Sequence, residues 1–249
     1  MARRNDSDPD APDGVATAPV GLWEDFVDIF YAPSEVFARR RSGKFGYALL
    51  FLVLAGVVLH FLLKNGMQPV MDAEFEFRRA EMLRSNPQMT SEQMAAGRGF
   101  FEAFAPVIFA VTFPVAIILT GGVLWAAGKL FDAKESLVAA IMISTYSQVP
   151  RLVQFLVTAA QGLFMDPASI TSAYSVGLSP ARFMDPVTAQ PVLLAFASRL
   201  DLFTIWVTVL LAIGLHVVGR IPKQSAAIAA AITWLVGGLP VIFGALRAS

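Results

Sequence analysis

The chain contains no cysteine, which excludes disulfide bonds, thiolate catalysis and cysteine-ligated metal sites. Charged residues are also scarce: they make up 15% of the 249 positions, whereas soluble domains contain about 25%. Only two histidines occur, and each stands alone near the end of an apolar segment, so no metal site is expected. The formal net charge is zero, and without a basic patch we expect no nucleic-acid partner.

The sequence motifs of intramembrane hydrolases are missing as well. There is no HExxH motif, and no histidine lies in the same segment as Ser144 and Ser147. Asp201 is the only acid near a predicted span apart from residues at the span ends, so an aspartyl dyad would have no second member. No glycine motif that cradles phosphate is present, because Gly121 and Gly122 lie inside an apolar segment. We therefore expect neither an enzyme nor a cofactor.

Apolar residues, in contrast, make up 56% of the chain. Five stretches approach or exceed the roughly 20 residues that a helix needs to cross a membrane: 45–63, 104–128, 137–163, 200–218 and 225–246. The predicted fold class is an all-α membrane protein with five transmembrane helices, preceded by an amphipathic interfacial helix. Residues 1–20 lack an apolar run and are predicted to be a disordered cytoplasmic tail, not a signal peptide. Residues 21–249 then form one membrane domain, with outer loops at 64–103 and 164–199.

The predicted interfacial helix follows the tail. Trp23, Phe26 and Phe30 fall at helical spacing, and we assign Asp25 and Asp28 to the opposite, polar side. The apolar side would pack on the protein itself or on lipid headgroups, with the protein the commoner choice for a single amphipathic helix.

The distribution of basic residues predicts the orientation. Segments 39–44, 129–136 and 219–224 hold eight Lys and Arg within 20 positions, whereas 64–103, 164–199 and 247–249 hold eight within 79. Basic residues beside spans favour the cytoplasm. The amino terminus is therefore predicted to be cytoplasmic and the carboxyl terminus extracytoplasmic.

Local signals predict details within this frame. Thr90 followed by Gln93 has the spacing of a capping box and predicts a helix start after a first loop helix at about 70–85. The sequence FMDP occurs at 164–167 and 183–186, and Asp before Pro is typical of a helix start. Small residues predict close helix packing, and three prolines predict bends. The small residues are Gly121, Gly122, Gly128 and the SAAIAAA run at 225–231. The prolines are Pro106, Pro114 and Pro240.

Polar residues interrupt the third predicted span, which reads ISTYSQVPRLVQ at 143–154. Pro150 cannot donate a backbone hydrogen bond and crowds the Tyr146 carbonyl, so the helix should break there. Arg151 would then act as a bracket to the fourth span through free carbonyls and Asp201, or as an anion or headgroup contact of a transport path. The predicted intramembrane polar site consists of Arg151, Pro150, Tyr146, Gln148, Ser144, Ser147, Gln154 and Asp201.

Three passages together resemble the Yip (Ypt/Rab-interacting protein) family. WEDFVDIFYAPSEVFARRR resembles the segment before its first span, and YSQVPRLV resembles its polar third helix. DLFTIWVTVLLAIGL at 201–215 resembles its fourth helix, with Asp201, Phe203, Trp206 and Gly214 as landmarks. The resemblance implies a five-helix integral membrane protein with a cytoplasmic amino end. Arg151 departs from the usual pattern of the third helix.

The resemblance also bears on the role of the chain. Eukaryotic Yip proteins associate with Rab GTPases and coat components through a long cytoplasmic region, which here has only about 44 residues. The Ala- and Arg-rich composition indicates a bacterial member in the cytoplasmic membrane. The leading hypothesis is a non-enzymatic protein that organises membrane or binds partners: membrane lipids, other membrane proteins, or itself through small-residue helix faces. The alternative is a transporter, channel or lipid-translocating protein that uses the broken third helix.

Overall fold

The computed structural model describes residues 21–248 except residue 86, so the predicted tail at 1–20 lies outside the described residues. The described part is helical and contains no strand. Its helices are α1 Leu22–Asp28, α2 Pro33–Arg39, α3 Gly46–Leu62, α4 Lys64–Ser85, α5 Ser91–Lys129, α6 Leu137–Ser147, α7 Pro150–Phe164, α8 Pro191–Arg199, α9 Leu202–Gly219 and α10 Lys223–Ala248, with 3₁₀ turns η1 Pro167–Ser169, η2 Ala173–Val176 and η3 Pro180–Phe183.

Three helices, α5, α9 and α10, are each long and apolar enough to cross a membrane. Helix α3 meets the same criteria only together with the first part of α4, from which it is bent by 84°, so the number rises to four if this pair is one span. Helices α6 and α7, with 11 and 15 residues, are individually too short. A helical membrane protein is therefore confirmed, whereas five separate crossings stay a prediction.

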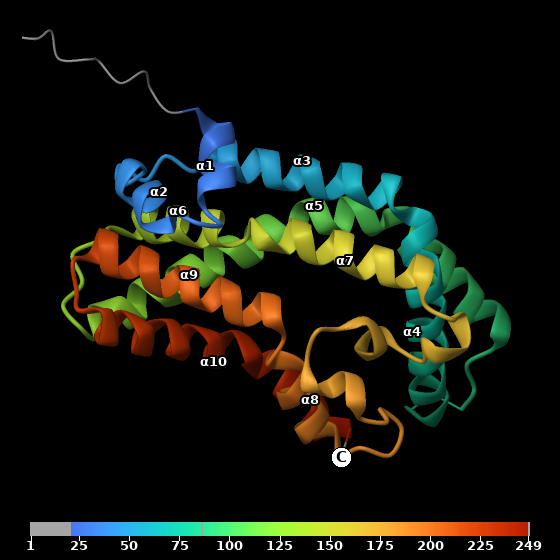
Figure 1. Ribbon diagram of the computed structural model, residues 1–249. Coiled ribbons are helices and arrows are strands. Elements are labelled where there is room, and N and C mark those ends of the chain that lie inside the picture. The colour runs from blue at the N-terminus through green and yellow to red at the C-terminus, as the bar shows by residue number, and fades with distance from the viewer. Residues whose placement is uncertain (1–20, 86, 249) are drawn as a thin grey trace, which may run out of the picture.

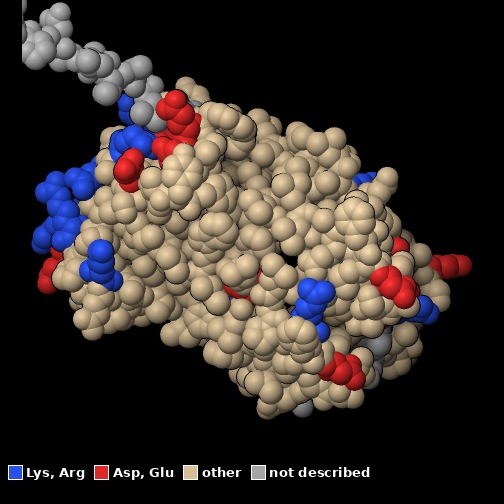
Figure 2. Space-filling model, viewed as in Figure 1, with Lys and Arg blue, Asp and Glu red and all other residues tan. Residues whose placement is uncertain are grey.

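The long elements lie side by side in a bundle (Figure 1). Helices α3, α5, the α6–α7 pair, α9 and α10 run alternately in opposite directions along it. Helices α1 and α2 lie at one end, and α4 turns across the opposite end, where it packs against α7. Basic side chains gather at the end that carries α2 and the α9–α10 connection (Figure 2).

The first outer loop is more helical than predicted. Helix α4 begins at Lys64, and only Leu63 separates it from the end of α3. Leu63 N donates to Leu59 O of α3, and Leu63 O accepts from Met67 N of α4, so helical hydrogen bonding continues across the junction. The capping box at Thr90 is confirmed: its Oγ1 accepts from Gln93 N at 3.2 Å, and its N donates to Gln93 Oε1 at 3.0 Å. The helix that it opens continues through Pro106 and Pro114 to Lys129, so the second loop helix and the second span are one element.

Small residues bring helices into close contact at several places. A Cβ atom added to Gly162 on α7 would lie 1.8 Å from the Gly66 carbonyl oxygen on α4, and one added to Gly121 would lie 2.7 Å from Ile141 Cα. Within the SAAIAAA run, Ala226, Ala229 and Ala230 are fully buried. The packing role predicted for Gly122 is wrong, since a Cβ added there would meet nothing within 4 Å and would face open space.

The two FMDP sequences behave differently. Asp166 caps η1 by accepting from Ala168 N at 3.0 Å, with Pro167 in the first helical position, as predicted. Asp185 accepts from Val187 N and the Thr188 hydroxyl, both at 2.9 Å, and forms a turn. The helix start predicted at Asp185 is wrong because an Asp side chain that bonds the backbone two residues on stabilises a turn equally well.

Candidate functional site

The third predicted span is broken beside Pro150, between α6 and α7. The amides of Gln148, Val149 and Arg151 each donate to the carbonyl three residues earlier, at 3.1, 3.2 and 2.9 Å. One of these acceptors is the Tyr146 carbonyl, so a tight backbone turn supplies the donor that Pro150 lacks. The predicted role of Arg151 as the donor to freed carbonyls is therefore wrong in this detail.

The polar residues of α6 are buried in the bundle. The Ser144 hydroxyl donates to the Ile117 carbonyl of α5 at 2.9 Å and ties the two helices together. Tyr146 and Ser147 are fully buried, and their hydroxyls have no hydrogen-bond partner among the described residues. Gln148 is partly exposed beside the break.

Arg151 and Gln154, one turn apart on α7, reach the start of α9. Arg151 Nη1 donates to Gln154 Oε1 at 2.7 Å, and its Nη2 donates to the Thr204 hydroxyl at 3.2 Å. Gln154 Nε2 in turn donates to Asp201 Oδ1 at 3.2 Å. Arg151 and Asp201, the counter-charge predicted for it, thus belong to one network, and the neutral amide of Gln154 stands between them.

Asp201 is buried and joins three segments of chain. As the N-cap of α9, its Oδ1 accepts from Phe203 N at 3.0 Å and Thr204 N at 3.3 Å. Its Oδ2 accepts from Leu178 N at 3.1 Å, and Leu202 N returns a bond to Leu178 O at 3.0 Å. With Gln154, the carboxylate has four N–H donors, which explains its burial without a directly bonded cation.

Arg199, at the end of α8, is a second cation beside this network that the sequence analysis did not select. Its Nη2 donates to the Trp234 carbonyl of α10 at 2.5 Å, and its guanidinium lies 5.3 Å from the Trp234 ring centroid. The sequence offered one indication of Arg199, its position two residues before Asp201. It was not selected because residues 164–199 were assigned only to an outer loop.

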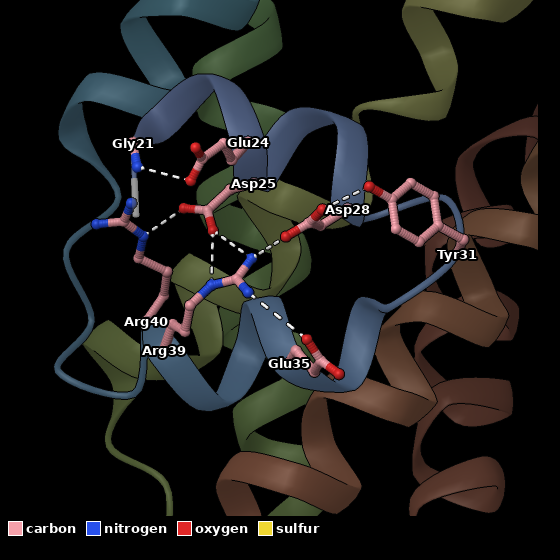
Figure 3. A network of polar contacts seen from close by, with 8 residues as sticks. All are labelled: Gly21, Glu24, Asp25, Asp28, Tyr31, Glu35, Arg39 and Arg40. Atoms are coloured by element: carbon pink, nitrogen blue, oxygen red, sulfur yellow. Dashed lines mark hydrogen bonds and ion pairs between the residues drawn. The ribbon is translucent and has the colours of Figure 1, made fainter. Parts of the chain in front are cut away.

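A second polar cluster, the amino-terminal clasp, consists of Asp25, Asp28, Arg39 and Arg40 (Figure 3). Asp25 on α1 is fully buried. Its Oδ1 accepts from Arg39 Nε at 3.1 Å and Nη2 at 2.9 Å, and its Oδ2 accepts from Arg40 Nε at 2.5 Å. Bonds from the Tyr31 hydroxyl and from Arg39 lower the pKa of the Asp28 carboxyl. Part of the basic run used to predict orientation therefore holds α1 against α2.

The assignment of Asp25 to the polar side of the interfacial segment is wrong. Asp25 precedes Ile29 by four positions and both residues are fully buried, so they share the inward face of the segment. The segment also forms two short helices, because Pro33 occupies the first position of α2.

The three aromatic residues selected in this segment differ in burial and in the rings that they contact. Phe26 is buried and stacks on Phe51 at a centroid distance of 4.4 Å, and Phe30 contacts Trp206 edge-on at 5.4 Å. Trp23 lies at 5.9 Å from Phe51 but remains 68% exposed. Phe26 and Phe30 therefore anchor the segment to the bundle, and Trp23 borders it.

Glu135, in the α5–α6 connection, is a buried carboxyl that the sequence analysis did not select. Its side chain is fully buried, and neither carboxyl oxygen has a hydrogen-bond partner in the described part of the chain. Gly128 and Gly219 make room for it: a Cβ at either position would lie within 2.7 or 2.8 Å of its oxygens. Burial raises the pKa of Glu135, and the Lys129 ammonium at 3.9 Å only partly offsets this.

Comparison with known proteins gives one match. The family model described as Yip1 domain matches residues 27–244, a range that contains the broken third helix and the Asp28, Arg39 and Arg40 residues of the clasp but begins after Asp25. No curated protein and no solved structure matches the chain.

Proposed function

Because the chain belongs to the Yip1 domain family, we propose that it is a non-enzymatic integral membrane protein that organises the membrane or binds other membrane proteins. The observation that carries this proposal is the apolar outer surface of the long helices. On α5, Val107, Val111 and Leu119 are 58, 61 and 64% exposed, and α10 carries a similar set. Exposed apolar surface of this extent fits lipid or partner helices.

Five crossings, with a cytoplasmic amino terminus and an extracytoplasmic carboxyl terminus in a bacterial cytoplasmic membrane, complete the proposal. The alternating directions of the five long elements and the basic end that carries α2 support this topology (Figures 1 and 2). A reporter fused after Ser249 should report an extracytoplasmic location. A cytoplasmic signal would show that one element, most simply the short α6–α7 pair, does not cross.

Binding of a partner helix is supported by two small residues on the outward face of α10. Ala227 and Ala231, one turn apart, are both exposed, and a small residue every fourth position lets a second helix approach closely in lipid. We expect a membrane protein, or a second copy, to cross-link to this face in native membranes. Ala227→Leu combined with Ala231→Leu should abolish the cross-link, whereas Val236→Leu on the same helix should preserve it. Native-membrane purification without any reproducible partner would contradict partner binding.

The rival proposal is a transport or lipid-translocating path along the broken third helix. The hydroxyls of Tyr146 and Ser147 beside the break have no hydrogen-bond partner within residues 21–248 as described, and they favour this path because broken helices with polar lining are typical of transporters. Purified protein in liposomes distinguishes the two. Potassium flux or movement of a fluorescent phospholipid above that of empty liposomes, lost in Tyr146→Phe, would support the path.

A further inference from the structure

Exposed basic side chains gather at one end of the bundle, the end that carries α2 and the α9–α10 connection (Figure 2). Five of them come from three connections that are distant in the sequence. Arg41 and Lys44 follow α2, Lys134 follows α5, and Arg220 and Lys223 lie at the α9–α10 connection. All five residues are exposed, and together they form what we call the basic surface.

Two hydrogen bonds hold these connections together at the last turn of α9. Arg41 Nη2 donates to the Val217 carbonyl at 3.0 Å, and Lys134 N donates to the Gly219 carbonyl at 2.9 Å. Gly219 is the last residue of α9, and Arg220 follows it directly. Residues from all three connections therefore meet at one helix end, so the folded chain places their charges on the same surface.

The basic surface has no carboxylate partners of its own. None of its five residues forms an ion pair in the described part of the chain. In the amino-terminal clasp, at the same end, Asp25 and Asp28 are bonded to the arginines of the clasp. Asp132 is the single exposed acid in the three connections, because Glu135 is buried. Unpaired cations on one surface produce a positive potential, which attracts anions.

Apolar side chains border the basic surface. Tyr47, three positions after Lys44, is 78% exposed, and Leu130 and Leu137, on either side of Lys134, are 71 and 44% exposed. Basic residues beside exposed aromatic and aliphatic side chains are typical of helix ends at the level of the lipid headgroups. An acidic protein would match the charges alone, whereas a membrane leaflet offers anionic headgroups with acyl chains directly beneath them.

We propose that the basic surface binds the phosphate groups of anionic phospholipids, whose acyl chains lie against the bordering apolar residues. Lys and Arg donate charged hydrogen bonds to phosphate, and each cation can meet the headgroup of a different lipid, so the five side chains need not converge on one point. Near a membrane surface each Lys or Arg strengthens the attraction to anionic lipid about fivefold. The inference rests on the proposed membrane placement, and it names the lipid class that the protein would hold at this end.

Native mass spectrometry of the whole protein, released from detergent, tests this inference with phosphatidylglycerol as the probe. The wild type should retain phosphatidylglycerol in preference to phosphatidylcholine, whose headgroup has no net charge. Arg220→Gln combined with Lys223→Gln should raise the dissociation constant for phosphatidylglycerol about twentyfold, and Lys134→Gln, in another connection, about fivefold. The second variant keeps the test independent of the folding of the first, because Lys134 is exposed and its bond to α9 uses the backbone.

Arg78→Gln combined with Arg79→Gln is the matched control. These two cations lie on α4, at the opposite end of the bundle, and each pairs with a glutamate of the same helix. The control should leave phosphatidylglycerol binding unchanged. Arg220→Lys combined with Lys223→Arg keeps both charges of the basic surface and should bind phosphatidylglycerol as the wild type does.

Equal affinity of the wild type for phosphatidylglycerol and phosphatidylcholine would overturn the proposal. Unchanged phosphatidylglycerol binding in Lys134→Gln and in a folded Arg220→Gln, Lys223→Gln variant would do the same. Displacement of the lipid by millimolar inorganic phosphate would assign the basic surface to a free anion and overturn the lipid assignment. Binding in detergent does not depend on orientation, so these results would leave the reporter-fusion and cross-linking tests unaffected.

Discussion

Gln154 joins Arg151 to Asp201: its Oε1 accepts from Arg151 at 2.7 Å, and its Nε2 donates to Asp201 at 3.2 Å. The amide oxygen faces the cation and the amide nitrogen faces the anion. A neutral side chain therefore carries the link between α7 and α9, and the start of α9 depends on it.

Gln154→Leu should lower the free energy of unfolding by about 1–3 kcal/mol, because Arg151 and Asp201 each lose one hydrogen bond and a charged group in a buried site is then less fully satisfied. Gln148→Leu makes the same chemical change beside the break, at a side chain that has no hydrogen bond among the described residues, and should change stability by less than about 0.5 kcal/mol. Thermal unfolding in detergent provides the comparison. Equal effects of the two substitutions would show that the network does not hold α7 to α9.

Arg151→Leu and Asp201→Asn should each lower thermal stability, and the double variant should lose less than the sum because both residues act through one network. The full double-mutant cycle, measured in the same detergent, gives the coupling. Strict additivity would mean that the two side chains act independently.

Asp25→Asn should loosen the amino-terminal clasp. It removes the charge shared by Arg39 and Arg40 but keeps the shape of the side chain, and we expect a loss of about 1–3 kcal/mol because both arginines remain partly exposed. Protease cleavage of the α1–α2 segment should accelerate accordingly. Glu35→Gln is the matched control, since Glu35 is 73% exposed and its pair with Arg39 is long, at 3.8 Å. Equal cleavage of both variants would contradict the role of the clasp.

Glu135 should make stability depend on pH. Its pKa is raised in the folded protein from an ordinary value of 4.5, so the folded state retains a proton that the unfolded state has lost. Stability should therefore fall as the pH rises from about 4.5 through the raised pKa. Glu135→Gln should abolish this part of the pH profile, whereas Asp132→Asn, at an exposed neighbour, should preserve it. A profile shared by wild type and Glu135→Gln would refute the assignment.

Gly162→Ala should destabilise the contact between α4 and α7. The added methyl group would lie 1.8 Å from the Gly66 carbonyl oxygen, so the helices must separate, at a cost of about 1–3 kcal/mol or more. Gly122→Ala, on α5, meets no atom within 4 Å and should be neutral or stabilising by up to about 1 kcal/mol. Thermal unfolding of both variants tests the contrast. A neutral Gly162→Ala would show that the two helices are not in contact there.

The features that could be predicted from sequence are those that depend on neighbouring residues. The capping box at Thr90, the break at Pro150 and the cap at Asp166 each follow from groups within four positions of one another. Asp185 shows the limit of this reasoning, because the same FMDP sequence forms a turn when the chain after it does not continue as a helix.

What the sequence by itself determined is therefore the membrane character, the family resemblance and most helix limits, since apolar length and local capping are properties of short segments. Only the tertiary structure decided the partners of the charged residues. Asp25 meets Arg39 and Arg40 across a helical hairpin, Gln154 meets Asp201 across two helices, and Arg199 reaches the middle of α10. These contacts join positions 14 to 47 residues apart, and which distant groups meet depends on how the helices pack.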